Sequence, residues 1–213
     1  MKLGIYCAGA VGIQIKEIAE LQGIWDEIIF IDDGKESGLF RGFKLFSFSE
    51  FSKKYKPSDA KIVIATGEPK LRETLYKKVK SKKYELANVI HPCSYISKDA
   101  KLGEGVVVEM TSYIGFDTNI GDNNLISAGS IVAHNCNLKP HSVILGAQVA
   151  GGCNIGKASL LGMGCVVRER TNIGDNALIS MGAIVFNDVP DGTIAMGNPA
   201  KVIAKNIGGE IYK

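Results

Sequence analysis

The sequence predicts an α/β unit up to about residue 90, followed by an all-β parallel β-helix. Two observations predict this fold. In the first half, short apolar runs that end in glycine or aspartate alternate with helical segments, which is typical of a small parallel sheet. In the second half, aliphatic residues recur every six positions, a period that fits neither an α-helix nor a hairpin. We therefore expect domains at residues 1–90 and 91–213.

Three apolar runs are the expected strands of the first half: residues 2–9 (KLGIYCAG), 27–33 (EIIFIDD) and 60–67 (AKIVIATG). A helical pattern follows from Pro69 to about Lys82. Its basic end, KKVKSKKYE, is interpreted as solvated helix C-terminus, where cations are favourable. Attraction of a phosphate-bearing ligand is the alternative. Ligands of such sheets bind beyond the carboxyl ends of the strands.

The segment AGAVG places Gly9 and Gly12 between the first strand and a helix, and Asp32 lies in the run that ends the second strand. The distance from Gly12 to Asp32 matches the spacing of about 20 residues at which an acidic residue commonly meets a ribose in nucleotide-binding folds. The two glycines could also serve only a tight turn and close helix packing. The pattern favours nucleotide binding without identifying the nucleotide.

The repeat of the second half runs in six-residue steps, with a single five-residue step between Ile144 and Val149. The residue four positions after each aliphatic anchor is usually small, with Asn124 and Gln148 as exceptions. Three hexapeptides make one triangular coil of about 18 residues, and stacked coils bury the anchors in one continuous column. The anchors are Ile96, Leu102, Val108, Ile114, Ile120, Ile126, Val132, Leu138, Ile144, Val149, Ile155, Leu161, Val167, Ile173, Ile179 and Val185.

Composition argues against several classes of function. The net charge of +3 is too small to indicate a nucleic-acid partner. No apolar run approaches the roughly 18 residues of a membrane span. The five cysteines are odd in number and lack C-x-x-C spacing, so we expect neither disulfides nor a metal site, and a reduced, cytoplasmic location.

The repeats LGEGVV, IGDNNL, IGKASL and IGDNAL, and the ending DGTIAMGNPAKVI, resemble the hexapeptide-repeat acyltransferases. With its Rossmann-like first half, the chain resembles the bacterial sugar acyltransferases grouped with sialic acid O-acetyltransferase and the bacillosamine and perosamine N-acetyltransferases. The resemblance covers nearly the whole chain. It implies a left-handed β-helix, acetyl-CoA as co-substrate without a metal, and a homotrimer with sites at subunit interfaces.

The resemblance implies that His134, in AHNCNLK, is the catalytic base. It lies two residues after the anchor Val132, a position that points outward in the family. Imidazole, with a pKa of about 6.5, suits proton transfer at neutral pH. Asn135 stands where the family usually has an acid; its amide can orient the ring but cannot stabilise imidazolium as a carboxylate does.

The resemblance also implies contacts to both substrates. The expected acetyl-CoA residues are His141, Gly146, Met163, Met181, Gly182 and Lys201. The expected sugar-nucleotide residues are Gly9, Ala10, Val11, Asp32, Asp33, Gly67 and Lys70. His141 could also be an exposed turn residue. Val11 stands where relatives often have histidine, so the acceptor sugar is expected to differ.

The expected function is transfer of acetyl from acetyl-CoA to the amino group of a UDP- or dTDP-linked deoxyamino sugar, for a surface glycan such as O-antigen, lipopolysaccharide or capsule. One alternative is O-acetylation of sialic acid or a related sugar hydroxyl. A non-catalytic nucleotide-sugar-binding scaffold is an alternative of another class, and a dinucleotide-binding oxidoreductase module is a further one.

Overall fold

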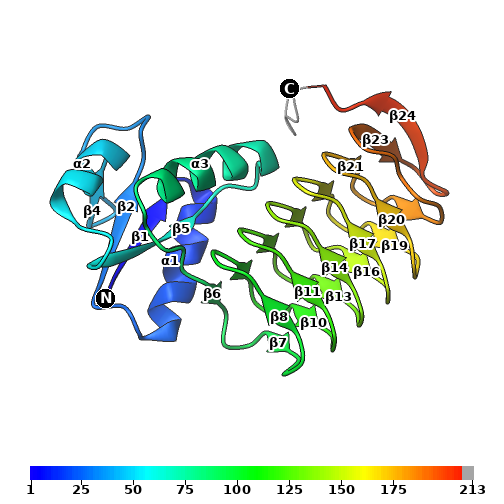
Figure 1. The fold of residues 1–213 in the computed structure, drawn as a ribbon, viewed down its shortest axis with the longest axis horizontal. Helices are drawn as coiled ribbons and strands as arrows, with labels where there is room; N and C mark the ends of the chain where they lie inside the picture. The colour runs from blue at the N-terminus through cyan, green and yellow to red at the C-terminus, as the bar shows by residue number, and fades with distance from the viewer. Residues whose placement is uncertain (208–213) are drawn as a thin grey trace.

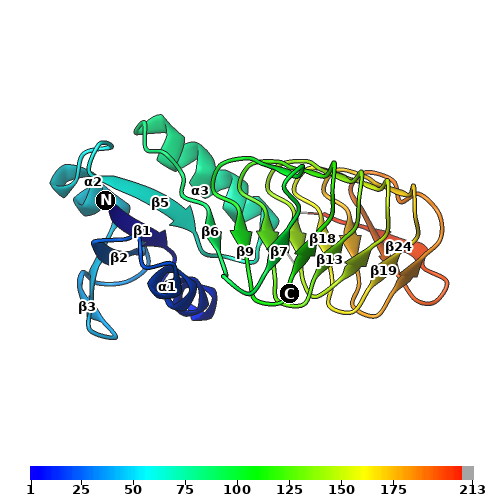
Figure 2. The same ribbon diagram turned by 90° about the horizontal axis from the view of Figure 1, so that it is seen from below.

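The computed structural model describes residues 1–207. An α/β domain lies at one end of a long parallel β-helix, whose short strands stack like rungs (Figures 1 and 2). This confirms the predicted order of the two architectures, and the β-helix is left-handed. Within residues 1–207, no helix is both long and apolar enough to cross a membrane.

The sheet of the N-terminal domain is built on three parallel strands, β1 (Lys2–Tyr6), β2 (Glu27–Ile31) and β5 (Ala60–Ile64). These are the three strands that the apolar runs predicted. An antiparallel hairpin of β3 (Gly38–Phe40) and β4 (Phe43–Phe46) extends the sheet at one edge, in the order β3-β4-β2-β1-β5.

Helices cover both faces of this sheet. Helix α1 (Ala10–Gln22) packs on one face, and α2 (Phe48–Lys54) and α3 (Pro69–Ser81) pack on the other. The helix expected from Pro69 is confirmed. The sequence reasoning missed α2, although its start is a capping box in which Ser47 and Glu50 bond each other's backbone N–H.

The basic end of α3 differs from a purely solvated helix terminus. Lys78 pairs with Asp33, and Lys80 pairs with Glu104 of the β-helix. These ion pairs are partly exposed and individually weak. They place the cations of α3 against both domains.

The β-helix has three parallel faces, here named sheets 1, 2 and 3. Sheet 1 contains β7 (Tyr95–Ile96), β10 (Tyr113–Ile114), β13 (Ile131–Val132), β16 (Gln148–Val149), β19 (Val166–Val167) and β22 (Ile184–Val185). Sheet 2 contains β8 (Lys101–Leu102), β11 (Asn119–Ile120), β14 (Asn137–Leu138), β17 (Asn154–Ile155) and β20 (Asn172–Ile173).

Sheet 3 begins with the strand that joins the two domains and ends with a C-terminal hairpin. It contains β6 (Val89–Ile90), β9 (Val107–Val108), β12 (Leu125–Ile126), β15 (Val143–Ile144), β18 (Leu160–Leu161), β21 (Leu178–Ile179), β23 (Thr193–Met196) and β24 (Lys201–Lys205). Strand β24 runs antiparallel to β23.

Every predicted anchor is the second residue of a two-residue strand and points into the coil, which confirms the six-residue repeat. Strand register links Ile96, Ile114 and Val132 in equal steps of one coil, and the next step, to Val149, is shorter by a single position. The shorter coil explains the Gln148 exception, because Ala147 is the fully buried corner residue there and Gln148 lies on the exposed side of its strand.

The outer face of sheet 3 carries the N-terminal domain. The first residues of its strands, Val107, Leu125, Val143 and Leu160, are buried in one hydrophobic cluster with α1 and the sheet of the N-terminal domain. In sheets 1 and 2, most of the corresponding residues are exposed. The two domains therefore share a continuous apolar core rather than touching across a polar surface.

Arg72 on α3 locks this junction. Its guanidinium is fully buried and donates to the carbonyl oxygens of Ile64, Thr66 and Asn123, and to Asn123 Oδ1, each at 2.9 Å. Burial lowers its pKa to about 9, so it still carries its charge at neutral pH. Because Thr66 follows β5 and Asn123 belongs to the β-helix, one side chain fixes a loop of the first domain to the second.

Candidate active site

His134 lies at the corner between sheets 1 and 2, just after β13, and its side chain is exposed. Its Nδ1 is 2.8 Å from Asn135 Oδ1. An amide oxygen can only accept a hydrogen bond, so this contact places a proton on Nδ1 and leaves the Nε2 lone pair for a substrate. The backbone of Asn135 is left-handed, with φ of 56°, a conformation that asparagine tolerates well.

The coils on either side hold the imidazole in place. On one side, the ring of Phe116 stacks on it with centroids 5.0 Å apart and an interplanar angle of 9°. On the other side lies Gly151, where an added Cβ would come within 2.6 Å of His134 Cε1 and 2.7 Å of Nε2. The ring therefore fills a slot between Phe116 and a position where only glycine fits.

A cavity of about 430 Å³ opens at the carboxyl ends of β1, β2 and β5. It brings together five of the predicted sugar-nucleotide residues: Gly9, Ala10, Val11, Asp32 and Gly67. Added Cβ atoms at Gly9 and Gly67 would meet nothing within 4 Å, so both backbones face open space. Lys35 also lines the cavity.

The start of α1 gives this cavity a positive character. Gly9 is the N-cap of α1, makes no side-chain cap, and no acidic residue lies in the first turn. The free N–H groups and the helix dipole favour an anion there. Gly12 allows the close approach of helix and loop, because an added Cβ would lie 2.2 Å from the Cys7 oxygen.

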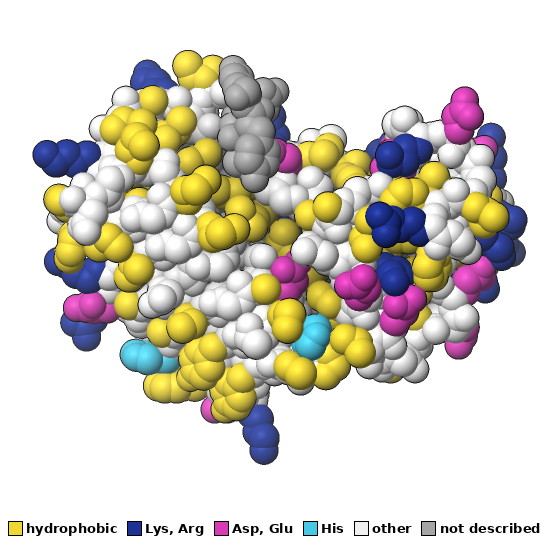
Figure 3. Space-filling model, turned by 180° about the vertical axis from the view of Figure 1, so that it is seen from behind, with side chains coloured by type: hydrophobic (Ala, Val, Ile, Leu, Met, Phe, Trp, Pro, Cys, Tyr) yellow, Lys and Arg dark blue, Asp and Glu magenta, His cyan; other side chains and the backbone are white. Residues whose placement is uncertain are grey.

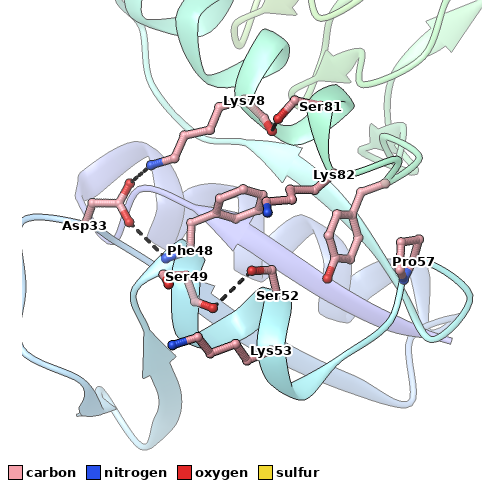
Figure 4. Close-up of a pocket in the computed structure, with 10 residues that line it drawn as sticks. Asp33, Phe48, Ser49, Ser52, Lys53, Pro57, Lys78, Ser81 and Lys82 are labelled. Atoms are coloured by element: carbon pink, nitrogen blue, oxygen red, sulfur yellow. Dashed lines mark hydrogen bonds and ion pairs between the residues drawn. The ribbon is translucent and has the colours of Figure 1, made fainter.

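The side chains of the two adjacent aspartates lie in different hollows. Asp32 lines the cavity, and its carboxylate accepts from the N–H of Ala8 at 2.8 Å and of Gly34 at 3.0 Å. Asp33 turns to the α2 and α3 face, where it accepts from the Phe48 N–H and binds Lys78, at the edge of a second hollow (Figure 4). It also accepts from the Tyr6 hydroxyl.

Asp33 therefore ties both helices to the end of β2. Burial alone would raise the pKa of this carboxyl, but its contacts with Lys78, Tyr6 and the Phe48 N–H hold the pKa below the usual range. Lys70 lies exposed in the first turn of α3, outside the lining of the cavity.

Four of the predicted acetyl-CoA residues lie along one edge of the β-helix. This is the corner between sheets 3 and 1, and we name it the methionine corner. Its equivalent residues in successive coils are Met110, Ala128, Gly146, Met163 and Met181, each two positions beyond a strand of sheet 3.

The N–H of Gly182 donates to the Met163 oxygen at 2.9 Å, which stacks consecutive coils of this corner. Met163 and Met181 are 67% and 78% exposed, so their side chains form an apolar edge open to a ligand. Lys201 is exposed in β24, opposite Met196 of the neighbouring strand.

His141 lies at the third corner, between sheets 2 and 3, and not at the methionine corner. It is 5% exposed, its Nδ1 is 3.1 Å from Asn123 Nδ2, and its ring packs 4.9 Å from that of Tyr76 on α3. Burial lowers its pKa to about 4. In the single chain, His141 is part of the domain junction beside Arg72 and is not an exposed turn residue.

Several residues of the site were missed from the sequence. Phe116 lies one coil before His134, and Gly151 lies one coil after it, across the shorter coil. Aligning the sequence coil by coil, rather than hexapeptide by hexapeptide, would have placed Phe116 and Gly151 next to the imidazole. Arg72 had no such signal, because its partners are backbone oxygens and one amide.

Comparison with known proteins finds one family model and several structures that are similar to this chain. Residues 2–79 match the family model of the PglD N-terminal domain. The acetyltransferase domain of PglB from Neisseria gonorrhoeae FA1090 matches with 29% identity and a TM-score of 0.91, covering 95% of this chain and 99% of that one. The same domain in complex with acetyl coenzyme A matches with a TM-score of 0.90.

Two further structures match nearly the whole chain. A mutant of GDP-perosamine N-acetyltransferase from Caulobacter crescentus, in complex with CoA and GDP-perosamine, has 26% identity and a TM-score of 0.89, covering 96% of this chain and 98% of that one. WeeI from Acinetobacter baumannii AYE has 25% identity and a TM-score of 0.89, covering 95% and 100%. Curated proteins show no significant match in sequence.

A glycine-lined cavity at the sheet edge, an oriented histidine on the β-helix and a fold shared with these acetyltransferases along almost its entire length agree with one another. Residues 2–79 match the PglD N-terminal domain, and along nearly its whole length the chain resembles sugar acetyltransferases that join such a domain to a left-handed β-helix.

Proposed function

We propose that the protein transfers acetyl from acetyl-CoA to the amino group of a nucleotide-linked amino sugar. The observation that carries this proposal is the imidazole of His134, an exposed side chain that Phe116 and Asn135 fix so that the Nε2 lone pair is left for a substrate. Two neighbours that share the fold along nearly the whole chain hold acetyl coenzyme A in one case and CoA with GDP-perosamine in the other.

The reaction requires one side chain that accepts a proton and later returns it. The sugar nitrogen attacks the thioester carbonyl, a C–N bond forms, and the C–S bond breaks as the tetrahedral intermediate collapses. His134 Nε2 accepts the proton that the nitrogen loses, and returns it to the leaving thiolate to give CoA. An amine that is already neutral is a good nucleophile. It therefore needs less help from the base than a hydroxyl does, which suits a histidine oriented by the neutral Asn135.

The N-terminal cavity is the proposed nucleotide site. Its glycine-lined floor lets a ligand approach the backbone, and the uncapped start of α1 favours a diphosphate. Two backbone N–H groups already hold the Asp32 carboxylate. Its orientation in the cavity is therefore fixed. Val11 lines the same cavity with an apolar side chain, which leaves the choice of sugar open.

The proposed assembly is a homotrimer with shared sites. Tyr95, Tyr113 and Ile131 on the outer face of sheet 1 are 59%, 41% and 41% exposed. Packing three copies of this face around an axis would bury it. Sheet 1 is bordered by the His134 corner on one side and the methionine corner on the other, so each site would combine one corner from each of two copies.

Two alternative functions predict different experimental results. O-acetylation of a sialic acid or related sugar would use the same base with a hydroxyl acceptor, and it predicts activity on sugars that lack an amine. A non-catalytic scaffold predicts binding without turnover. The oriented imidazole and the exposed methionine corner favour catalysis. The five free cysteines favour a reducing compartment for this reaction, and a surface glycan is the proposed destination of the product.

The test is CoA release from acetyl-CoA with a panel of UDP-, dTDP- and GDP-linked amino sugars. We expect turnover with one of them, and a loss in kcat of about 10²–10⁴-fold in His134→Ala. Lys101→Ala, which changes an exposed residue of β8 on the outer face of sheet 2, separates a specific loss from a general one. Turnover only with hydroxyl acceptors would establish O-acetylation. Binding of acetyl-CoA and sugar nucleotide without any turnover would establish the scaffold.

A further inference from the structure

A hollow of about 210 Å³ lies between α1 and the methionine corner, apart from the glycine-lined cavity. Figure 3 shows this side of the molecule, where a histidine lies among hydrophobic side chains at the boundary of the domains. Gln14 and Glu17 of α1 form one wall, and His91, Met110 and Ala128 form the other. We name it the junction hollow.

A buried carboxylate lies at the base of the junction hollow. Glu109 is 7% exposed. Its Oε2 accepts both hydrogen bonds that the described residues provide, from Ser127 Oγ at 2.9 Å and from the Ala128 N–H at 3.0 Å. Its Oε1 takes none from residues 1–207 but is not sealed from solvent. A buried charge with one oxygen left for a ligand suits a cationic or strongly donating group.

The walls supply the remaining polar groups of a sugar site. His91 Nδ1 accepts from the Cys93 N–H at 3.0 Å, so its Nε2 carries a proton and can donate to a hydroxyl. Gln14 offers both a donor and an acceptor. Met110 and Ala128 add apolar surface, which fits the unsubstituted carbons of a deoxysugar. Convergent polar groups over an apolar wall are typical of small-ligand sites.

The position of the hollow connects the two proposed half-sites. Its α1 wall begins five residues after Gly9, about 7.5 Å along the helix, so a sugar attached to a diphosphate at the start of α1 would extend toward it. Along the chain, His134 follows β13 and lies between the levels of Ala128 and Gly146. Rotation about an axis parallel to the β-helix does not change the height of a residue along that axis. The His134 of a second copy would therefore meet the methionine corner beside Ala128.

We propose, building on the proposed function, that the junction hollow is the subsite for the amino sugar and that Glu109 holds its amino group. Glu109 Oε1 accepts one N–H of the acceptor and orients the nitrogen toward the thioester. The proton released on attack goes to His134 of the second copy, not to Glu109. The acceptor binds as its ammonium ion, which a carboxylate attracts more strongly than a neutral hydroxyl, and it loses one proton to solvent before the nitrogen attacks. Glu109 thus selects an amine over a hydroxyl at the binding step, whereas the glycine-lined cavity recognises the nucleotide.

The test uses Glu109→Gln, which keeps an oxygen for Ser127 and Ala128 but removes the charge. Calorimetry would compare UDP, dTDP and GDP with their 4-amino-4,6-dideoxy sugar conjugates and the matching 4-hydroxy conjugates. We expect the variant to bind the amino-sugar conjugate about 10- to 100-fold more weakly. Its affinity for the nucleoside diphosphate, its KM for acetyl-CoA and its Tm should stay unchanged. Glu20→Gln, on the same helix but outside the lining of the junction hollow and paired with Lys16, is the matched control.

Each outcome separates the inference from the proposed function. Equal binding of the amino-sugar conjugate by wild type and Glu109→Gln would overturn the subsite, even if the wild type acetylates that sugar. An equal loss for the nucleoside diphosphate, or a lowered Tm, would make Glu109 structural and also overturn it. A wild type that binds the amino sugar through Glu109 yet releases no CoA would refute the proposed reaction while leaving the subsite in place.

Discussion

At the scale of single residues, the geometry of the proposed catalytic site depends on how the coils are stacked. His134 was predicted from its motif, but the motif does not say what holds the ring. The structure shows that Phe116 and Gly151, equivalent positions in the adjacent coils, flank the imidazole. A residue at the same corner one coil away is a neighbour as direct as the next residue in sequence.

Gly151→Ala should impair the base without disturbing the fold. The backbone of Gly151 is outside the left-handed region, and the three nearest atoms to an added Cβ all belong to the His134 ring. The methyl group would therefore displace the imidazole. We expect kcat to fall about 100-fold, with the KM for acetyl-CoA and the Tm unchanged. A loss in Tm that accompanies the loss in kcat would instead indicate that the coil itself is disrupted.

Asn135→Asp should strengthen the base. A carboxylate facing His134 Nδ1–H stabilises the imidazolium that forms during the reaction. Because a more basic imidazole is neutral only at higher pH, the acid limb of kcat/KM should move to higher pH, and the plateau rate should rise. Asp also tolerates the left-handed backbone at this position. A pH–rate profile identical to that of wild type would show that Asn135 only orients the ring.

At the scale of elements, the strands followed from the sequence but the contact between α3 and the β-helix did not. The apolar runs that became β1, β2 and β5 have to be buried, so their pattern is visible. Arg72 looks like a surface residue of an amphipathic helix, yet its stem and guanidinium are fully buried against Asn123. Only the fold reveals that neutral oxygens from two domains converge on it.

His141, next to this contact, should make stability depend on pH. Its folded pKa is lowered to about 4 from 6.5, so above pH 6.5 the residue is neutral in both states and costs nothing. As pH falls from 6.5 toward 4, the unfolded chain binds a proton that the folded chain rejects, and stability decreases.

Asparagine tolerates the left-handed backbone at position 141. We therefore expect the free energy of unfolding of His141→Asn to fall by about 2–3 kcal/mol less than that of wild type over this pH interval. Urea unfolding at pH 7 and pH 4 measures the difference. An equal pH dependence in both proteins would place the titration on other groups.

For the whole molecule, the β-helix was predictable because its anchors repeat without a break, and the placement of the N-terminal domain was not predicted. A signal for it did exist. In sheet 3 the residue before the anchor is aliphatic in successive coils, at Val107, Leu125, Val143 and Leu160, whereas it is Asn or Lys throughout sheet 2 and interrupted by Gln148 in sheet 1. That unbroken aliphatic row indicated that something covers sheet 3.

Shared sites should allow two inactive chains to restore activity together. His134→Ala and Gly146→Val each damage a different corner, so every site in a pure preparation of either variant should be defective. Subunit exchange in an equal mixture should leave about one quarter of the sites with both corners intact. CoA release that reappears on mixing, with assembly size followed by sedimentation, would demonstrate sharing. Persistent inactivity in confirmed mixed assemblies would place both corners in one chain.

The continuous core between α1 and sheet 3, reinforced by Arg72, leaves the enzyme no hinge between its two domains. The glycine-lined cavity and the junction hollow are consequently held at a constant separation. If they bind the nucleotide and the amino sugar as proposed, this separation fixes the length of acceptor that can occupy both. A conjugate whose phosphate bridge is one unit shorter or longer would seat either its nucleoside or its amine, but not both. Selection by length would then operate before any contact with the base, and it would reject nucleoside monophosphate sugars whatever amine they carry.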